Sequence, residues 1–248
     1  MLKKTLLSIV VLLVCAVVAH SQVADKTTQK LIKQLDHRAA GRRIEAANLL
    51  GKIKSEAAVP GLIEALDDSV WGVRSAAARA LWRIGSPAAD SARAALDARL
   101  HEDESGKVRV MSAGALWRLG VEAKALIPHV RPVLDDESAY AQVDAADMLL
   151  DMGVASKEVL PTLEHAMASD ESALRKKVID CLLPRSEEFE SLFLRALNDS
   201  EWSIRLAAVG AFWGGGSPEA VAGLKSATKD RNRAVRSAAQ EVLDALEP

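Results

Sequence analysis

One residue position recurs along this chain at nearly constant spacing, and this repetition limits the fold more than any other feature. The spacings between successive occurrences are 31, 35, 33, 33, 30 and 31 residues. A period of this length suits two helices joined by short turns, and one such pair cannot bury its own apolar stripe. The sequence therefore predicts an all-α solenoid (a superhelix) of about seven stacked helix pairs. The recurring position is occupied by Arg43, Arg74, Arg109, Gln142, Arg175, Arg205 and Arg236.

Two further markers keep the same register. Pro60 is followed by Pro128 and Pro161 at the offsets of the recurring position, and proline is favoured at the start of a helix. An acidic residue stands six positions earlier in five repeats, at Asp68, Asp103, Asp136, Asp199 and Asp230. The markers together predict one solenoid domain over 25–248, with approximate repeats 25–54, 59–85, 91–120, 126–153, 159–185, 189–216 and 220–247.

The second half of each repeat is predicted to be a helix with one apolar side. Within 59–85, the residues from Val73 to Ile84 that repeat along the chain lie in a sector about 100° wide. Aromatic residues make up only 4% of the chain, which suits many thin helix–helix contacts better than one large core. Three of these helices are predicted to stop at a glycine, namely Gly85, Gly120 and Gly153.

The run VRSAAARALWRIG over 73–85 resembles the short HEAT-type repeat of the subclass first noted in phycobilin lyases. The resemblance covers nearly all of 25–246, and it is specific for fold but not for function. It implies that recurrent aspartate and arginine side chains bond along the inner loops and tie repeat to repeat. It also implies that this ladder lapses at Gln142 and at Ser169, which takes the aspartate position in the fifth repeat. The implied ladder residues are Asp68/Arg74, Asp103/Arg109, Asp199/Arg205 and Asp230/Arg236.

Three tryptophans, Trp82, Trp117 and Trp213, share one repeat position. This position lies about 155° from the centre of the apolar sector, so the indoles are predicted to point away from their own helix pair. The resemblance places second helices on the concave face of the solenoid. One hypothesis is that the indoles anchor a partner there, because tryptophan is enriched among interface hot spots; the alternative is that each fills the seam with a neighbouring helix. Residues three and seven positions earlier complete the predicted partner-binding strip: Val110, Gly114, Leu206 and Gly210.

Other departures from the repeat predict local irregularity. Trp71 and Trp202 fall in turns within repeats and are expected to pack there. Pro184 falls inside a second helix, where proline removes a backbone hydrogen bond, and together with Gln142 it predicts a local bend. The triple glycine at 214–216 predicts a loose helix end.

The residues able to carry chemistry form no recognisable site. His37, His101, His129 and His165 fall at different repeat positions, so they make no ladder of metal ligands. Cys181 aligns with a small buried position and is expected to be an inert hydrophobe. We therefore expect no catalytic residue, no metal, no cofactor and no enzymatic activity.

The first residues read as a secretory signal. Lys3 and Lys4 precede an apolar run over 6–18, and Ala19 and Ser21 supply small residues before Gln22, which predicts a signal peptide over 1–21. The run is shorter than the roughly 20 residues that span a bilayer, so cleavage is expected, with an uncleaved anchor as the alternative. Loss of the two lysines takes the formal charge from −2 to −4, with both signs interspersed, which does not favour nucleic-acid binding. The chain is expected to be periplasmic, cell-surface or secreted, with no membrane span after cleavage.

Two functions from different classes remain. The first is a non-enzymatic, monomeric scaffold or adaptor that holds a protein or peptide on its concave face, in the cell envelope or outside the cell. The second, drawn from the resemblance, is a bilin-lyase-like chaperone that holds a tetrapyrrole and its acceptor protein; export argues against it, because that chemistry is cytosolic. A self-assembling array is disfavoured, because Gln240, Glu241 and Asp244 give the last helix a polar outer face that suits a cap.

Overall fold

The computed structural model describes residues 26–246, and within this range the chain has helices and turns but no strand. The all-α solenoid prediction is confirmed: seven helix pairs follow one another along the chain. The predicted signal peptide over 1–21 lies outside the described residues. A search of the described helices found none with the length and apolar character that a membrane span requires.

The chain divides into two compact units, Met1–His129 and Val130–Pro248, and α7 contains the boundary. The prediction of one continuous domain over 25–248 stays a prediction. The helices of unit 1 are 26–34 and α2 (Ala40–Lys52), α3 (Val59–Glu64) and α4 (Trp71–Ile84), and α5 (Arg93–Glu102) and α6 (Gly106–Arg118). Those that follow are α7 (Ala123–Val130) and α8 (Ala139–Asp151), α9 (Ser156–Met167) and α10 (Ser172–Leu182), α11 (Glu190–Ala196) and α12 (Trp202–Gly210), and α13 (Pro218–Ala227) and α14 (Arg233–Leu246).

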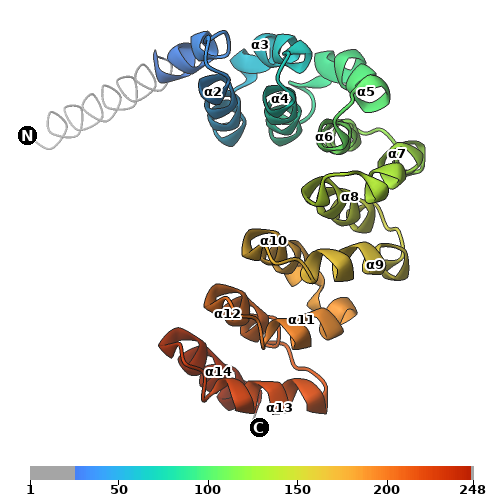
Figure 1. Cartoon of the computed structure of the whole chain (residues 1–248). Coiled ribbons are helices and arrows are strands. Elements are labelled where there is room, and N and C mark those ends of the chain that lie inside the picture. The colour runs from blue at the N-terminus through green and yellow to red at the C-terminus, as the bar shows by residue number, and fades with distance from the viewer. Residues whose placement is uncertain (1–25, 247–248) are drawn as a thin grey trace, which may run out of the picture. The chain divides into compact units, whose positions relative to one another are not determined.

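Each unit has two layers, one of first helices and one of second helices. In unit 1, the second helix α4 packs between α2 and α6, while α3 and α5 lie in the other layer (Figure 1). Small residues let the second helices approach closely: a Cβ built on Gly51 of α2 would lie 2.6 Å from the Cα of Ala80 on α4. Because the alanines at 76–78 are also fully buried, α4 is covered along most of its length.

The predicted helix stops at glycine are confirmed. Gly85, Gly120 and Gly153 have φ values of 72°, 91° and 85°, a backbone conformation that glycine adopts without steric cost. In the first repeat the same position is held by Lys54, whose φ is 51°. Its N–H bonds to the carbonyl of Gly51, and the N–H of Ser55 bonds to that of Leu50, so a lysine closes this helix with the same two bonds that occur at Gly120 and Gly153.

The two expected irregularities in unit 2 differ in their outcome. Helix α10 ends at Leu182, two residues before Pro184, and a 3₁₀ segment (Leu183–Phe189) follows, so the helix is interrupted here as expected. The local bend that Pro184 and Gln142 predict stays a prediction. Helix α12 ends at Gly210 and a turn follows. The prediction that Trp213 lies on the outer face of a second helix is therefore wrong: Trp213 lies in this turn, just before the triple glycine.

Candidate partner-binding surface

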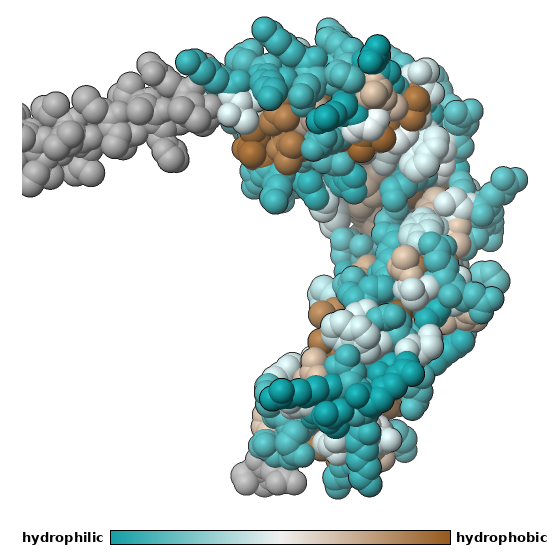
Figure 2. All heavy atoms as spheres, turned by 60° about the vertical axis from the view of Figure 1, so that its left-hand side comes forward, coloured by the Kyte–Doolittle hydropathy of each residue, from teal (hydrophilic) through white to brown (hydrophobic). Residues whose placement is uncertain are grey.

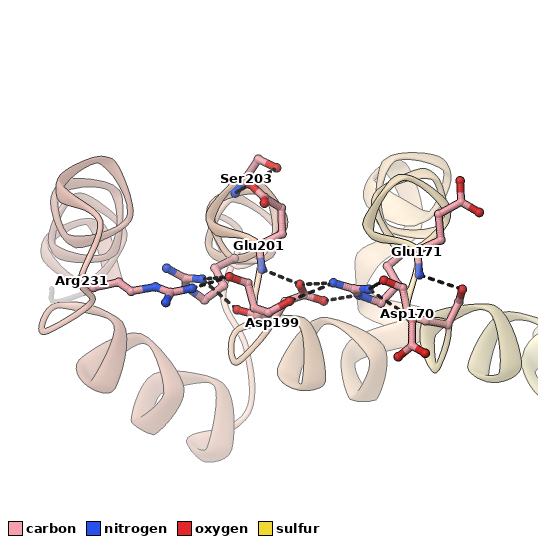
Figure 3. A network of polar contacts seen from close by, with 10 residues as sticks. Asp170, Glu171, Asp199, Glu201, Ser203 and Arg231 are labelled. Atoms are coloured by element: carbon pink, nitrogen blue, oxygen red, sulfur yellow. Dashed lines mark hydrogen bonds and ion pairs between the residues drawn. The ribbon is translucent and has the colours of Figure 1, made fainter.

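A row of arginine–aspartate pairs runs through the inner loops of each unit, and Figure 3 shows the part between 169 and 231. Four of the arginines reach the aspartate of the following repeat rather than that of their own. In unit 1, Arg74 places Nε 2.7 Å and Nη2 2.9 Å from the carboxylate oxygens of Asp103. The same bidentate geometry joins Arg43 to Asp68, Arg175 to Asp199 and Arg205 to Asp230.

The remaining bonds of each arginine are made within its own repeat. Nη1 of Arg74 donates to the carbonyl oxygen of Asp68 at 2.9 Å, and Asp68 in turn accepts the N–H of Val70 at 2.8 Å. Arg109 and Arg236 bind the carbonyls of Asp103 and Asp230 in the same way. These bonds tie the loop to the second helix and the repeat to its neighbour.

Three carboxylates of this ladder, those of Asp68, Asp199 and Asp230, have a lowered pKa and are held in their charged form. The hydrogen bond from Arg205 keeps the pKa of Asp230 below its ordinary value. At Asp68 and Asp199 burial raises the pKa, but the arginine partner and a backbone N–H together lower it by more, so the net shift is downward. Because four arginines of the ladder are each paired with a carboxylate in this way, these pairs are structural and offer no net charge to a ligand.

The lapse expected at Gln142 and Ser169 falls on a single step of the ladder. Gln142 stands in the arginine position and Ser169 in the aspartate position of the step between the fourth and fifth repeats, so both charges of that step are lost together. Each keeps its bond within its own repeat: Gln142 Nε2 donates to the Asp136 carbonyl at 2.7 Å, and Ser169 Oγ accepts the N–H of Glu171 at 3.1 Å. The fifth repeat itself stays connected onward, because Arg175 pairs with the following repeat.

Ion pairs elsewhere link these two repeats. Lys177 of α10 pairs with Asp144 of α8 at 2.5 Å. Arg185, in the 3₁₀ segment after α10, pairs with Asp147 at 3.0 Å and also with Asp151. Burial, with the nearby Asp151 charge, raises the pKa of Asp147 above its ordinary value. The charged links between the fourth and fifth repeats are therefore made by α8, α10 and the 3₁₀ segment after α10, and not by the inner loops.

All five tryptophans have an exposed side chain. Trp82 and Trp117 are 39% and 37% exposed and lie in the last turns of the adjacent helices α4 and α6, and Trp213 of unit 2 is 54% exposed. The expectation that Trp71 and Trp202 pack in their turns is wrong, because they are the first residues of α4 and α12 and are 51% and 44% exposed. Whether any of these indoles binds a partner stays a prediction.

The apolar strip expected beside the indoles is at the surface in only one of its two repeats. Val110 and Gly114 are buried, because α6 is covered along its length and exposes only Trp117 and Arg118 in its last turn. Leu206 is half-buried. A Cβ built on Gly210 would meet no atom within 4 Å, so the predicted notch is open there.

Three cations beside Trp82 were missed by the sequence reasoning. Lys54, Arg83 and Arg118 line a cavity of about 320 Å³ together with this indole. Arg118 reaches across from α6 to the end of α4, where a Cβ built on Gly85 would lie 3.5 Å from its Nε. The repeat carried a signal for two of them, Arg83 and Arg118, because the residue after the tryptophan position is basic in each of the first three repeats, where the first has Lys52.

The groups able to carry chemistry are dispersed in the part of the chain that the structure describes. Between 26 and 246 there is no cluster of three or more His, Cys, Asp or Glu side chains suited to a metal ion. The rings of His101 and His129 make an edge-to-face contact with centroids 4.3 Å apart. Burial raises the pKa of the Cys181 thiol to about 12, so this cysteine is protonated at neutral pH and is a poor nucleophile.

A second cavity, of about 340 Å³, lies in unit 2 beside the glycine-rich turn. It is lined by the glycines at 214–216 and by Ser186, Glu187 and Glu190. The Glu190 carboxylate accepts the N–H of Ser217 at 2.9 Å, which fixes one wall. The cavity holds acidic side chains and no cation in its lining, so it does not resemble a phosphate site.

Comparison with known proteins agrees with this architecture. Residues 28–116 match the family model of HEAT repeats. The structure of YibA of Escherichia coli is 16% identical, with a TM-score of 0.51, over 87% of this chain and 92% of that one. The complex of CpcE and CpcF of phycocyanin lyase from Nostoc sp. PCC7120 is 20% identical over 88% of this chain and 94% of that one, with a TM-score of 0.45. No curated protein matches the sequence. The chain is therefore similar to HEAT-repeat proteins: the family model matches its first repeats, and stacked helix pairs of the same kind continue through the rest of the described residues.

Proposed function

We propose that this protein is a non-enzymatic scaffold that binds a protein or peptide through the exposed tryptophans at the ends of its second helices. The observation that carries the proposal is the pair Trp82 and Trp117, which are exposed on the adjacent helices α4 and α6. A large indole loses favourable apolar burial when it stays in water, and tryptophan is enriched among the residues that dominate binding energy. An interface that covers both indoles would recover that burial.

The proposal includes the absence of catalysis and a place in the cell envelope or outside the cell. In support of the first, the buried guanidinium groups of the ladder are saturated by carboxylates and carbonyls, and the Cys181 thiol is protonated. In support of the second, Lys3, Lys4 and the apolar run over 6–18 have the order of a secretory signal. We further propose that the exported protein is a monomer.

Affinity capture with matched tryptophan variants tests the scaffold proposal. The protein that begins at Gln22 would be used as bait on the envelope fraction of its own host, and bound proteins would be identified by mass spectrometry. We expect a partner that is retained by the native protein and lost by the Trp82→Ala/Trp117→Ala/Trp213→Ala variant.

The control is the variant Trp71→Ala/Trp202→Ala, which removes two equally exposed indoles from the opposite ends of second helices. It should retain the partner, and circular dichroism should show that both variants keep native helicity. Equal capture by the native protein and both variants would overturn the role of the three tryptophans.

A further inference from the structure

Lys54, Trp82, Arg83 and Arg118 form one cavity in unit 1, here named the Trp82 pocket. It lies where the second helices of the first three repeats end. Three positive charges surround one exposed indole in this pocket, although charges of both signs are interspersed along the chain as a whole. This local excess of positive charge is unusual for the chain and calls for an explanation.

The cations of the Trp82 pocket differ from those of the ladder in having no carboxylate partner. Arg74 and its equivalents are bound bidentately, whereas no side-chain hydrogen bond or ion pair of Lys54, Arg83 or Arg118 occurs among residues 26–246. The guanidinium groups of Arg83 and Arg118 therefore present their N–H donors to solvent. An external anion would find these donors unoccupied.

Interaction with the helix dipole accounts for part of this arrangement. A cation in the last turn of a helix is stabilised by the exposed carbonyls, and Arg83 and Arg118 occupy that position in α4 and α6. The dipole does not account for Lys54, which stands beyond the end of α2 at a φ of 51°. Glycine holds the equivalent positions at 85, 120 and 153, and a side chain is disfavoured at positive φ. A lysine is thus kept where the backbone favours glycine.

Apolar surface adjoins the cations. Ile53, the residue before Lys54, is 53% exposed, and Leu49 one turn earlier on α2 is 38% exposed. Figure 2 shows a brown apolar patch on the N-terminal helix pair with teal hydrophilic residues around it. A ligand at this end of unit 1 would therefore meet both positive charge and apolar side chains.

We propose that the Trp82 pocket binds an extended acidic peptide segment, with carboxylates on Arg83 and Arg118 and an apolar side chain against the indole. The two arginines lie on neighbouring helices, whose axes are about 8–10 Å apart in packed helices. In a polyproline II segment the rise is about 3.1 Å per residue, so residues i and i+3 lie about 9 Å apart on one face. Acidic residues three positions apart would reach successive arginines. This inference rests on the proposed function and names the chemistry of its partner.

Titration of defined peptides tests the inference. The probe is a synthetic peptide with glutamate at every third position and proline at the others, and the readout is the dissociation constant from fluorescence anisotropy of a labelled peptide in low salt. We expect salt-sensitive binding of the glutamate peptide and none of its lysine counterpart. The variant Arg83→Gln/Arg118→Gln should weaken binding at least 10-fold.

Two further variants separate binding from folding. Lys54→Gly should weaken binding several-fold while raising the thermal midpoint, because glycine relieves the positive-φ conformation. Lys225→Gln removes one exposed charge from unit 2 and should leave the dissociation constant unchanged. A loss of both affinity and thermal stability in Lys54→Gly would overturn the assignment, since the lysine would then be structural.

The remaining outcomes also decide the question. No binding of the glutamate peptide, or equal binding by all variants, overturns the inference but leaves the scaffold proposal standing if tryptophan-dependent capture persists. Inorganic tripolyphosphate or a short oligonucleotide would be titrated in parallel. If either competes at lower concentration and depends on the same arginines, the pocket is a phosphate site and the peptide assignment is wrong.

Discussion

Four ladder arginines, namely Arg43, Arg74, Arg175 and Arg205, each join an aspartate of the next repeat to a carbonyl of their own loop, so one side chain fixes two segments at once. The energetic weight of this arrangement comes from burial. The Asp103 carboxylate is fully buried beside Arg74, and a buried charge without its partner is costly because water no longer solvates it. Each pair therefore adds little to the free energy of unfolding by its attraction, but removal of one member lowers that free energy strongly.

Replacing Arg74 by methionine should therefore be strongly destabilising. We expect the free energy of unfolding to fall by about 3 kcal/mol, since Asp103 would stay buried and lose its bidentate partner, with only Arg99 left at 4.0 Å. The matched control is Arg42→Met: Arg42 is exposed and pairs with the exposed Glu45, and such surface pairs contribute at most about 1 kcal/mol. Urea unfolding followed by circular dichroism measures both, and equal losses would contradict a special role for the ladder.

The lowered pKa values of Asp68, Asp199 and Asp230 predict how stability depends on pH. A carboxyl whose pKa is lower in the folded state binds fewer protons there than in the unfolded chain, where its pKa is about 3.9. The stabilisation is then complete above that value and is lost as the pH falls through the lower folded pKa values. Thermal midpoints should be flat between about pH 5 and 7 and should fall steeply in more acidic solution. A decline that begins at neutral pH would contradict this origin.

At the scale of the helix, the distance between neighbouring second helices decides whether a glycine on one of them can be replaced by a larger residue. The position that carries tryptophan in three repeats carries Gly51 in the first, and there a Cβ would lie 2.6 Å from a backbone atom of Ala80. Gly210 on α12 faces open space instead. There is therefore no room for a side chain at Gly51, whereas there is room for one at Gly210.

Alanine at these two glycines should give opposite results. Gly51→Ala should lower the free energy of unfolding by about 1–3 kcal/mol, because overpacking forces the backbones of α2 and α4 apart. Gly210→Ala should be neutral or slightly stabilising, because alanine has the higher helix propensity and meets no neighbour. Thermal unfolding of the two variants under one set of conditions decides the matter. A neutral Gly51→Ala would show that the helices are not in such close contact.

The uncharged step of the ladder can be rebuilt. Introducing Gln142→Arg together with Ser169→Asp should recreate the bidentate pair of the other steps, whereas Ser169→Asp alone adds a half-buried carboxylate without a counter-ion. A double-mutant cycle should give a favourable coupling of about 1 kcal/mol. A coupling of zero would mean that the loops of these two repeats are not held in the geometry of the other steps.

The helix pattern shows what a sequence can and cannot predict here. Helix stops at Gly85, Gly120 and Gly153 followed from local chemistry, since positive φ favours glycine wherever it occurs. The burial of Val110 did not, because a helical wheel describes one helix, whereas burial depends on what covers that helix. Only part of the Trp82 pocket could be predicted: Arg83 and Arg118 share one repeat position, whereas Lys54 stands at a position that glycine holds in the next three repeats.

At the scale of the whole molecule, the protein is a chain of similar units held by short-range contacts. With aromatics at only 4% of residues, its stability rests on alanine-rich helix contacts and loop ion pairs, and most of its few large aromatic side chains are tryptophans. All five tryptophans have exposed side chains, although large apolar side chains are usually buried. Exposure of the residue type that contributes most to interfaces is the feature that a binding role explains best.

The affinity of a captured partner for two tryptophan variants tests this account most directly. Isothermal titration calorimetry would compare Trp82→Ala/Trp117→Ala with Trp71→Ala, which removes an indole from the other end of α4. The account predicts a loss of affinity of at least about 30-fold for the double variant, as for hot-spot residues, and less than about 3-fold for Trp71→Ala. Equal affinities, or a larger loss for Trp71→Ala, would contradict the claim that the partner binds at the C-terminal ends of α4 and α6.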